Sequence, residues 1–223
     1  MQLSLSKKII FYIFLIIFLS TLNSKHISEI RFKNVDQITV IGLQENERQD
    51  LLKDLQLLNL NNIFFLKKFE LTNKLDANKL IENYEIFKKY PNALDIKIER
   101  TEFLAKINKN GKIFLIGTNG KLSDVKFLDK ELPFIFGKPK IEEFIKFTNV
   151  IEQSKFSLNQ VKNLYFFPSK RWDLEFKNNI ILKLSKDNTQ LSLDQAFEII
   201  DDKNFNNIKV VDARIKNQII LND

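Results

Sequence analysis

Side chains that commonly carry out catalysis are scarce in this chain. It contains no cysteine and one histidine, His26, which excludes disulfides, zinc–thiolate clusters, iron–sulfur centres and multi-histidine metal sites. A lone histidine in a polar stretch also argues against a serine–histidine triad. Five glycines are too few for phosphate-binding loops. These counts predict neither a cofactor nor a metal, and they argue against most classes of enzyme.

Carboxylates are the remaining candidates for acid–base chemistry. Glu99 and Glu102 lie close to Arg100, but neighbouring residues on a strand point to opposite faces, so a solvated charge cluster is the simpler interpretation. No pair of carboxylates stands out as the acid and base of a glycosidase. The net charge of +7 comes from interleaved signs without an Arg-rich block, which does not favour binding of nucleic acid.

The N-terminal segment predicts where the rest of the chain lies. An apolar run, Ile9–Leu19, follows Lys7 and Lys8 with no acidic residue before it, so the amino end should stay cytoplasmic and the remainder should be exported. A helix over 9–22 would be about 21 Å long, against about 30 Å for the hydrocarbon core. Both a signal anchor and a cleaved signal peptide remain open, and the lack of an Ala-x-Ala site favours the anchor. The predicted segments are a cytoplasmic tail (1–8), a transmembrane anchor (9–22) and a stalk (23–37).

Hydrophobic spacing predicts a small α+β unit over residues 38–102, with two helices packed on one face of a small sheet. The first helix is expected at 45–58. The second is expected at 76–90, with Asp76 as N-cap and Pro91 as its stop. The strands flanking these helices are Ile38–Leu43 and the alternating segment Leu94–Ile98.

The remainder, 103–223, is predicted to be a strand-rich domain with helices packed on its sheet. Asn110-Gly111 and Asn119-Gly120 are hairpin-type turns. Helices are expected at 141–151 and 192–201. The expected strands are Phe103–Ile107, Lys112–Ile116, Val161–Phe167, Trp172–Phe176, Ile180–Leu184, Ile208–Arg214 and Gln218–Leu221.

Several motifs occur in an order that resembles the FtsQ/DivIB family of bacterial cell division proteins. The stretch ITVIGL is similar to the opening strand and turn of that family's POTRA domain, and PNALDIKIERTEFLA resembles its domain junction. Further along, GKIFLIGTNG resembles a strand and turn of its C-terminal domain, and LPFIFG resembles its Leu-Pro…Gly step. RWDLEFKNNIILKL resembles its Arg-Trp hairpin, and VVDAR resembles its Val-Asp-Leu-Arg stretch near the last strands. The resemblance covers nearly all of residues 30–221. POTRA domains of outer-membrane assembly proteins are a poorer match, because this chain has no serial repeats and no room for a barrel.

The resemblance implies a non-enzymatic scaffold of the divisome, with a POTRA-like domain followed by a β-domain. It implies a single-pass type II protein of the bacterial inner membrane, held through residues 9–22, with its bulk in the periplasm at the division septum. The implied partners are FtsB and FtsL, and through them FtsW and FtsI, with FtsK as an upstream partner of the POTRA-like unit. Such a protein controls septal peptidoglycan synthesis.

In this family the end of the β-domain accepts a strand from FtsB, which is β-augmentation of a sheet edge. Ile219 and Leu221 share one face of the matching strand and Ile220 lies on the other, so one face should join the core. The arginines are expected near that edge, paired with an acidic partner residue. The residues implied in partner binding are Arg171, Arg214, Ile215, Gln218, Ile219, Ile220 and Leu221.

A different class of function remains open from the sequence. A cleaved, secreted α+β module could bind cell-wall polymer or a small ligand in a groove lined by its many phenylalanines, and the positive charge would suit anionic wall polymers. Loss of residues 1–24 from the mature protein would favour it.

Overall fold

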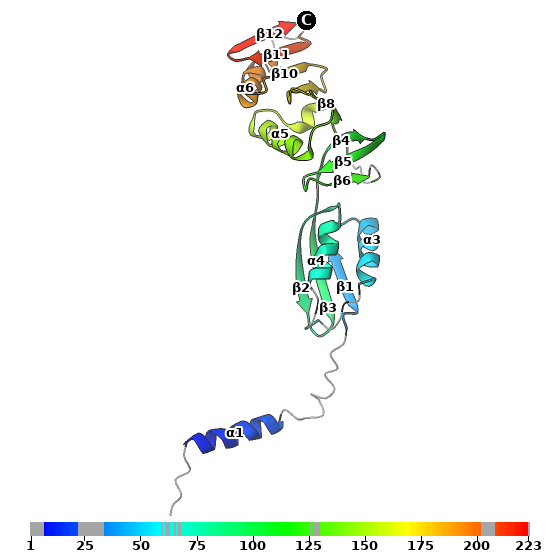
Figure 1. The fold of residues 1–223 in the computed structure, drawn as a ribbon, viewed down its shortest axis with the longest axis vertical. Helices are drawn as coiled ribbons and strands as arrows, with labels where there is room; N and C mark the ends of the chain where they lie inside the picture. Colours follow the sequence, from blue (N-terminus) through cyan, green and yellow to red (C-terminus); the bar gives the residue numbers. More distant parts are fainter. Residues whose placement is uncertain are drawn as a thin grey trace, which may run out of the picture. The chain divides into compact units, whose positions relative to one another are not determined.

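The computed structural model describes residues 7–21, 34–58, 60, 63–64, 66, 68–124, 126, 130–201 and 208–222 (Figure 1). His26, most of the predicted tail and most of the predicted stalk lie outside the described residues. Two compact units account for the contacts, one formed by 1–72 with 85–97 and the other by 73–84 with 98–223.

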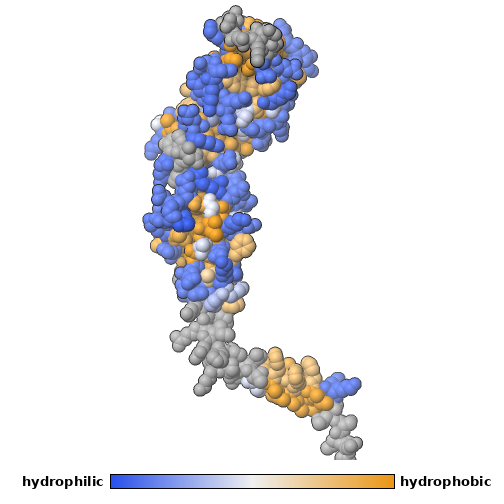
Figure 2. Space-filling view, turned by 180° about the vertical axis from the view of Figure 1, so that it is seen from behind, coloured by the Kyte–Doolittle hydropathy of each residue, from blue (hydrophilic) through white to orange (hydrophobic). Residues whose placement is uncertain are grey.

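The N-terminal apolar run forms helix α1, Lys7–Thr21, which is 15 residues long. Its side chains from Ile9 to Leu19 are all exposed, and Figure 2 shows this helix as a continuous apolar surface with a hydrophilic patch at one end. Among the helices that the structure describes, none is long and apolar enough to cross a membrane.

A three-stranded sheet with two helices follows α1. Its strands lie in the order β1-β3-β2, with β1 parallel to β3. In the first compact unit the described buried apolar side chains come from β1, α3, α4, β3 and the segment between the helices (Leu60 and Ile63), so both helices contribute to one core. The elements are β1 (Gln37–Ile41), α3 (Glu45–Gln56), α4 (Lys68–Ala77), β2 (Ile81–Lys89) and β3 (Ala93–Arg100).

The predicted helix over 76–90 is wrong. The second helix is α4, which ends at Ala77, and residues 81–89 form strand β2 beside β3. Leu80, Ile81, Tyr84 and Phe87 fit helical spacing, but Tyr84 and Ile86 also alternate with exposed neighbours. β-Branched and aromatic side chains suit such a half-buried strand, and Pro91 stands in the turn to β3 rather than at a helix end.

A nine-stranded sheet follows, in the order β12-β11-β10-β9-β8-β7-β4-β5-β6. All seven strands predicted for this part are present; the short strands β6 and β7 were not predicted. Parallel pairs join β4 to β7, β7 to β8 and β10 to β11. The elements are β4 (Phe103–Lys109), β5 (Lys112–Gly117), β6 (Leu122–Asp124), β7 (Phe134–Phe136), α5 (Ile141–Gln153), η2 (Leu158–Gln160), β8 (Val161–Phe166), β9 (Trp172–Phe176), β10 (Ile181–Leu184), α6 (Thr189–Ile200), β11 (Val210–Ile215) and β12 (Gln218–Asn222).

The register of this sheet separates an apolar face from a polar one. One cross-strand row is entirely apolar and packs into the core with side chains of α5 and α6. The next row, on the opposite face of the same strands, is mostly polar or charged; we call this face the open face. The core row is Ile107, Ile135, Leu164, Leu174, Leu182, Val211 and Leu221. The neighbouring open-face row is Phe136, Tyr165, Asp173, Lys183, Asp212 and Ile220.

Gly137 is required where β7 meets β8. Its φ of +105° lies in the left-handed region, and a Cβ added there would stand 2.3 Å from the carbonyl oxygen of Phe166. Any side chain at this position would therefore push two parallel strands apart. This steric limit explains why the LPFIFG stretch ends in glycine.

Candidate partner-binding edge

Strand β12 is the outermost strand of the nine-stranded sheet, and among the strands that the structure describes its one neighbour is β11. Asn217, at φ +59°, makes the turn between them. Gln218 and Ile220 are exposed, whereas Ile219 and Leu221 are half-buried against the core. The backbone along the outer side of β12 is therefore available to pair with another strand.

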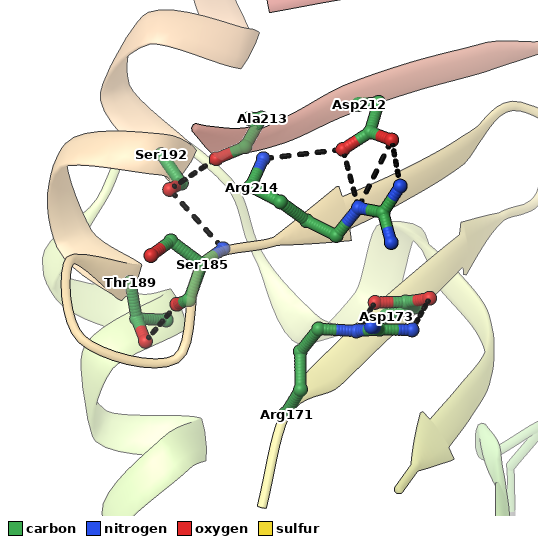
Figure 3. Close-up of polar contacts among 8 residues, drawn as sticks. All are labelled: Arg171, Asp173, Ser185, Thr189, Ser192, Asp212, Ala213 and Arg214. Carbon is green, nitrogen blue, oxygen red and sulfur yellow. Dashed lines mark hydrogen bonds and ion pairs between the residues drawn. The ribbon is translucent and has the colours of Figure 1, made fainter. Parts of the chain in front are cut away.

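Two arginines on the open face are held by aspartates two residues away. Arg171 Nε and Nη2 lie 3.0 and 3.2 Å from the two carboxylate oxygens of Asp173. Arg214 Nε lies 2.8 Å from Asp212 Oδ1, and its Nη2 lies 2.5 Å from Oδ2. Residues two apart on a strand point to the same face, which makes each pair possible. Figure 3 shows the two pairs on neighbouring parts of the sheet.

These pairs form a charged cluster that we call the arginine cluster: Arg171, Asp173, Lys183, Asp212 and Arg214. Lys183 stands in register between the two aspartates. Hydrogen bonds from Arg214 lower the pKa of Asp212, and those to Asp212 raise the pKa of Arg214. The charge of Asp173 adds to the second effect. Three positive charges against two negative ones leave the cluster with a positive excess.

An aromatic ring also holds Arg171. The guanidinium carbon lies 4.2 Å from the centre of the Phe167 ring, a cation–π arrangement. The Arg171 side chain is only 24% exposed and that of Asp173 only 6%. Arg171 is therefore the more rigid of the two arginines, and Arg214, at 45%, is the more accessible.

A buried serine fixes the strand that carries Arg214. Ser192 Oγ, on α6, donates a hydrogen bond of 2.8 Å to the carbonyl oxygen of Ala213 and accepts one of 3.3 Å from the backbone N–H of Ser185 (Figure 3). One hydroxyl thus joins α6 to β11 and to the end of β10. Because Ala213 directly precedes Arg214, this contact positions the base of the arginine.

The structure brings together most of the residues implied by the resemblance. Ile215 closes β11, and Gln218, Ile219, Ile220 and Leu221 make up β12. Arg214 lies on the strand next to the edge, but Arg171 precedes β9, three strands in from β12.

The arginines also have partners that were not predicted. Each holds an aspartate of its own chain, and pairing with an acidic residue of a binding partner stays a prediction. Asp173, Lys183 and Asp212 are members of the cluster that sequence reasoning missed. The patterns Arg-x-Asp at 171–173 and Asp-x-Arg at 212–214 could have revealed the two aspartates, because both place opposite charges on one face of a strand.

The cavities of the second unit differ in their lining. One of about 550 Å³ is lined by β4, α5, η2 and nearby loops, with more polar than apolar residues and one phenylalanine, Phe103. Another of about 340 Å³ is lined by Phe156, Phe176 and Ile200 together with polar residues. The phenylalanines of the second unit are largely buried, for example Phe144 and Phe147. No group of three or more potential metal ligands occurs among the described residues.

Comparisons with known proteins agree with this architecture. Residues 33–100 match the POTRA domain, FtsQ-type, and residues 99–214 match the C-terminal domain of cell division protein FtsQ/DivIB. Cell division protein FtsQ of Rickettsia conorii is 28% identical over 193 residues, which cover 82% of this chain and 70% of that protein. Cell division protein DivIB of Clostridium tetani is 29% identical over 182 residues, covering 78% and 67%.

The match to the FtsQ/DivIB C-terminal domain is the more informative of the two domain matches about the β12 edge. It includes the whole arginine cluster and stops at Arg214, so β12 lies just beyond the matched residues. It covers more than half of the chain, and the chain therefore belongs to the FtsQ/DivIB family of bacterial cell division proteins.

Proposed function

We propose that this chain is a division scaffold that binds FtsB and FtsL through β12 and so links early and late division proteins. FtsK, FtsW and FtsI complete the proposed set of partners, and the binding regulates septal peptidoglycan synthesis. Proteins of this family are non-enzymatic division proteins. The observation that carries the proposal is the position of β12 at the edge of the sheet.

Strand addition supplies the binding chemistry. A strand of FtsB would pair its backbone with the outer side of β12 and extend the sheet to ten strands. No residue from Gln218 to Asn222 is charged, so β12 lacks the lysines and glutamates that usually protect an edge. Ile220 gives the incoming strand an apolar neighbour on the open face.

The arginine cluster supplies selectivity. A guanidinium has five N–H groups, and Asp212 engages two of those on Arg214. The remaining donors and the positive excess of the cluster favour a carboxylate on the partner, close to the edge. Arg214 is the primary contact and Arg171, deeper and more rigid, extends it.

The N-terminal segment gives the proposed location. Residues 9–22 anchor the chain in the bacterial inner membrane as a single-pass type II protein with its bulk in the periplasm, at the septum. Support comes from the unbroken apolar surface of α1 behind Lys7 and Lys8.

The test replaces one apolar residue at the edge of the sheet and one at the other end of the same open-face row, on an interior strand. Ile220→Lys puts a charge on the outer strand, and Phe136→Lys puts the same charge on the same face of β7. The two side chains are 43% and 45% exposed, so the variants are matched. Capture of FtsB by purified chain should fall by at least about tenfold for Ile220→Lys. It should stay near the wild-type value for Phe136→Lys.

Circular dichroism and urea unfolding check that both variants fold. Capture that survives Ile220→Lys, or that falls equally in both variants, contradicts strand addition at β12. A mature protein lacking residues 1–24 would contradict the anchor and favour a secreted binding module instead.

A further inference from the structure

The first compact unit exposes large apolar side chains mainly at one end. Outside α1, the described residues of this unit include six such side chains: Ile41, Leu57, Phe64, Phe69, Phe87 and Tyr90. All but Ile41 belong to segments that meet at the end of the unit where β2 finishes, with exposures of 51% to 84%. We call these five residues the aromatic end.

Contacts within the unit bring these segments together. The Phe64 and Tyr90 rings are in contact, with centres 4.7 Å apart and planes tilted by 38°. Lys88 Nζ, at the end of β2, donates a hydrogen bond of 2.8 Å to the carbonyl oxygen of Ile63. The Tyr84 hydroxyl, in the first half of β2, donates a hydrogen bond of 2.9 Å to Asp76, in the last turn of α4. Helix α4 therefore runs antiparallel to β2. Phe69, in the first turn of α4, thus lies towards the end of β2.

The chain from α1 enters the unit at this same end. The backbone N–H of Asp36 lies 3.1 Å from the carbonyl oxygen of Asn92, in the turn after β2, and the Asn92 amide donates to the Asp36 carboxylate at 2.7 Å. Fourteen residues separate Thr21 from Asp36, which limits the distance between α1 and this end to about 50 Å. Figure 1 shows β1 beginning where β2 ends.

The chemistry of the aromatic end suits a lipid–water interface. Exposed Phe and Leu supply apolar area, and tyrosine combines an apolar ring with a polar hydroxyl, as in interfacial aromatic belts. Among the described lysines there, Lys88 donates to a carbonyl oxygen and Lys89 pairs with Asp95, while Lys68, beside Phe69, is exposed. Contact should therefore depend on apolar burial more than on anionic headgroups.

We propose that the aromatic end contacts the headgroup region of the bilayer in which α1 is anchored, which restrains the first unit close to the membrane. This inference takes one element from the proposed function, the membrane anchor at residues 9–22. The bilayer is the chosen occupant because the chain itself keeps this end within reach of it, and because the exposed residues match interfacial chemistry.

The experiment uses the full chain reconstituted into vesicles that contain brominated lipid, which quenches nearby tryptophan. Phe69→Trp and Tyr90→Trp place probes in the aromatic end. Ile41→Trp is the matched control, because Ile41 is 58% exposed at the opposite end of β1. Trp172 is buried and sets the background in the parent chain. Emission should fall for the two probes of the aromatic end and stay at background for position 41, in zwitterionic and anionic vesicles alike.

A second set of variants tests the cause. Phe64→Ser in the Phe69→Trp background should bring the quenching back towards the control, because less apolar area is left to hold the end in the interface. Equal quenching at positions 69, 90 and 41, or quenching at none, overturns the inference. Cross-links between copies through position 69 without quenching would also overturn it, since a second copy would then cover the aromatic end.

Two controls separate this inference from the proposed function. Flotation of the full chain with the vesicles reports the anchor. A chain that floats without quenching rejects the membrane contact and leaves the anchor intact, whereas a chain that does not float rejects both. Capture of FtsB by the β12 edge is measured in a separate experiment, so neither result changes the conclusion about that edge.

Discussion

The aromatic end of the first unit and the β12 edge of the second both expose apolar side chains, but in different surroundings. Ile220 stands on a hydrogen-bonded ladder, beside ion pairs of fixed geometry. Phe69 and Tyr90 offer exposed rings and apolar area, and polar groups near them, such as Lys88 and Asn92, bond within the unit. A ladder with fixed charges specifies one strand in one register, whereas a group of rings suits a fluid surface that has no register. On the two proposals made above, exposed hydrophobic residues in this chain serve two purposes, one at each surface.

Charge reversal at Arg214 should produce the largest difference between the two surfaces, because it should weaken FtsB capture and leave lipid quenching unchanged. Arg214→Glu places a carboxylate beside Asp212 and removes the positive excess of the arginine cluster. We expect capture of FtsB to weaken by about 30-fold or more, in the range seen for hydrogen-bonded charge pairs at interfaces. Brominated-lipid quenching at Phe69→Trp should not change.

Lys177→Glu is the control for Arg214→Glu. It changes the net charge equally at an exposed position just after β9. If both variants lose capture to the same extent, the cluster has no specific role and only overall charge matters.

Loss of the Ser192 hydroxyl should weaken the edge without touching its surface. Ser192→Ala leaves the Ala213 carbonyl and the Ser185 N–H without this buried partner, so the free energy of unfolding should fall by about 1–3 kcal/mol. Thr189→Ala, which removes a less buried hydroxyl on the same helix, should have a smaller effect. Urea unfolding measures both. A Ser192→Ala protein as stable as wild type would show that α6 does not hold β11 through this contact.

Salt should distinguish the two surfaces to a lesser degree. Raising NaCl from about 0.05 M to about 0.5 M shortens the screening length severalfold, so capture of FtsB should weaken several-fold. Quenching at the aromatic end should stay the same, because apolar burial is not screened. Salt-sensitive quenching together with salt-insensitive capture would reverse the assignment of the two surfaces.

The smallest expected effect concerns the middle of the open face. A hydrogen bond to Glu175 raises the pKa of Tyr165 to about 12. The folded state therefore holds this proton more tightly than the unfolded state, whose tyrosine titrates near 10. The resulting stability is complete below pH 10 and is lost as the pH rises towards 12. Tyr165→Phe should flatten this part of the stability curve, measured by urea unfolding at several pH values. It should leave FtsB capture at neutral pH unchanged, because Tyr165 is remote from the edge.

Local patterns predicted much of the fold. Strand β9 was predicted with its observed bounds, Trp172–Phe176, because it is short, bounded by turn residues and rich in aromatic and apolar side chains. The turn at Asn110-Gly111 was also predicted, and both residues have positive φ. The strand β2 was mistaken for a helix, because its apolar residues fit both periods and only pairing with β3 decides between them. Strands β6 and β7 have three residues each, too few to show any period.

The candidate site was predicted less completely than the fold. The residues of β12 were named from the resemblance, and their alternation between core and surface follows from strand geometry. The position of β12 at the edge depends on the parallel pairing of β10 with β11, which joins strands 26 residues apart through α6. The arginine cluster depends on that same long-range register, so Lys183 and Asp212 could not be placed together from local sequence.

The parallel crossover through α6 also has a consequence for timing. Strands β11 and β12 follow every other strand of their sheet in the chain, so they are synthesised last. Until residues 210–222 are present, β10 is the outer strand on that side, with Lys183 but without Asp212 or Arg214. On the proposed function, an unfinished chain has no edge suited to FtsB, and we expect only completed molecules to bind it.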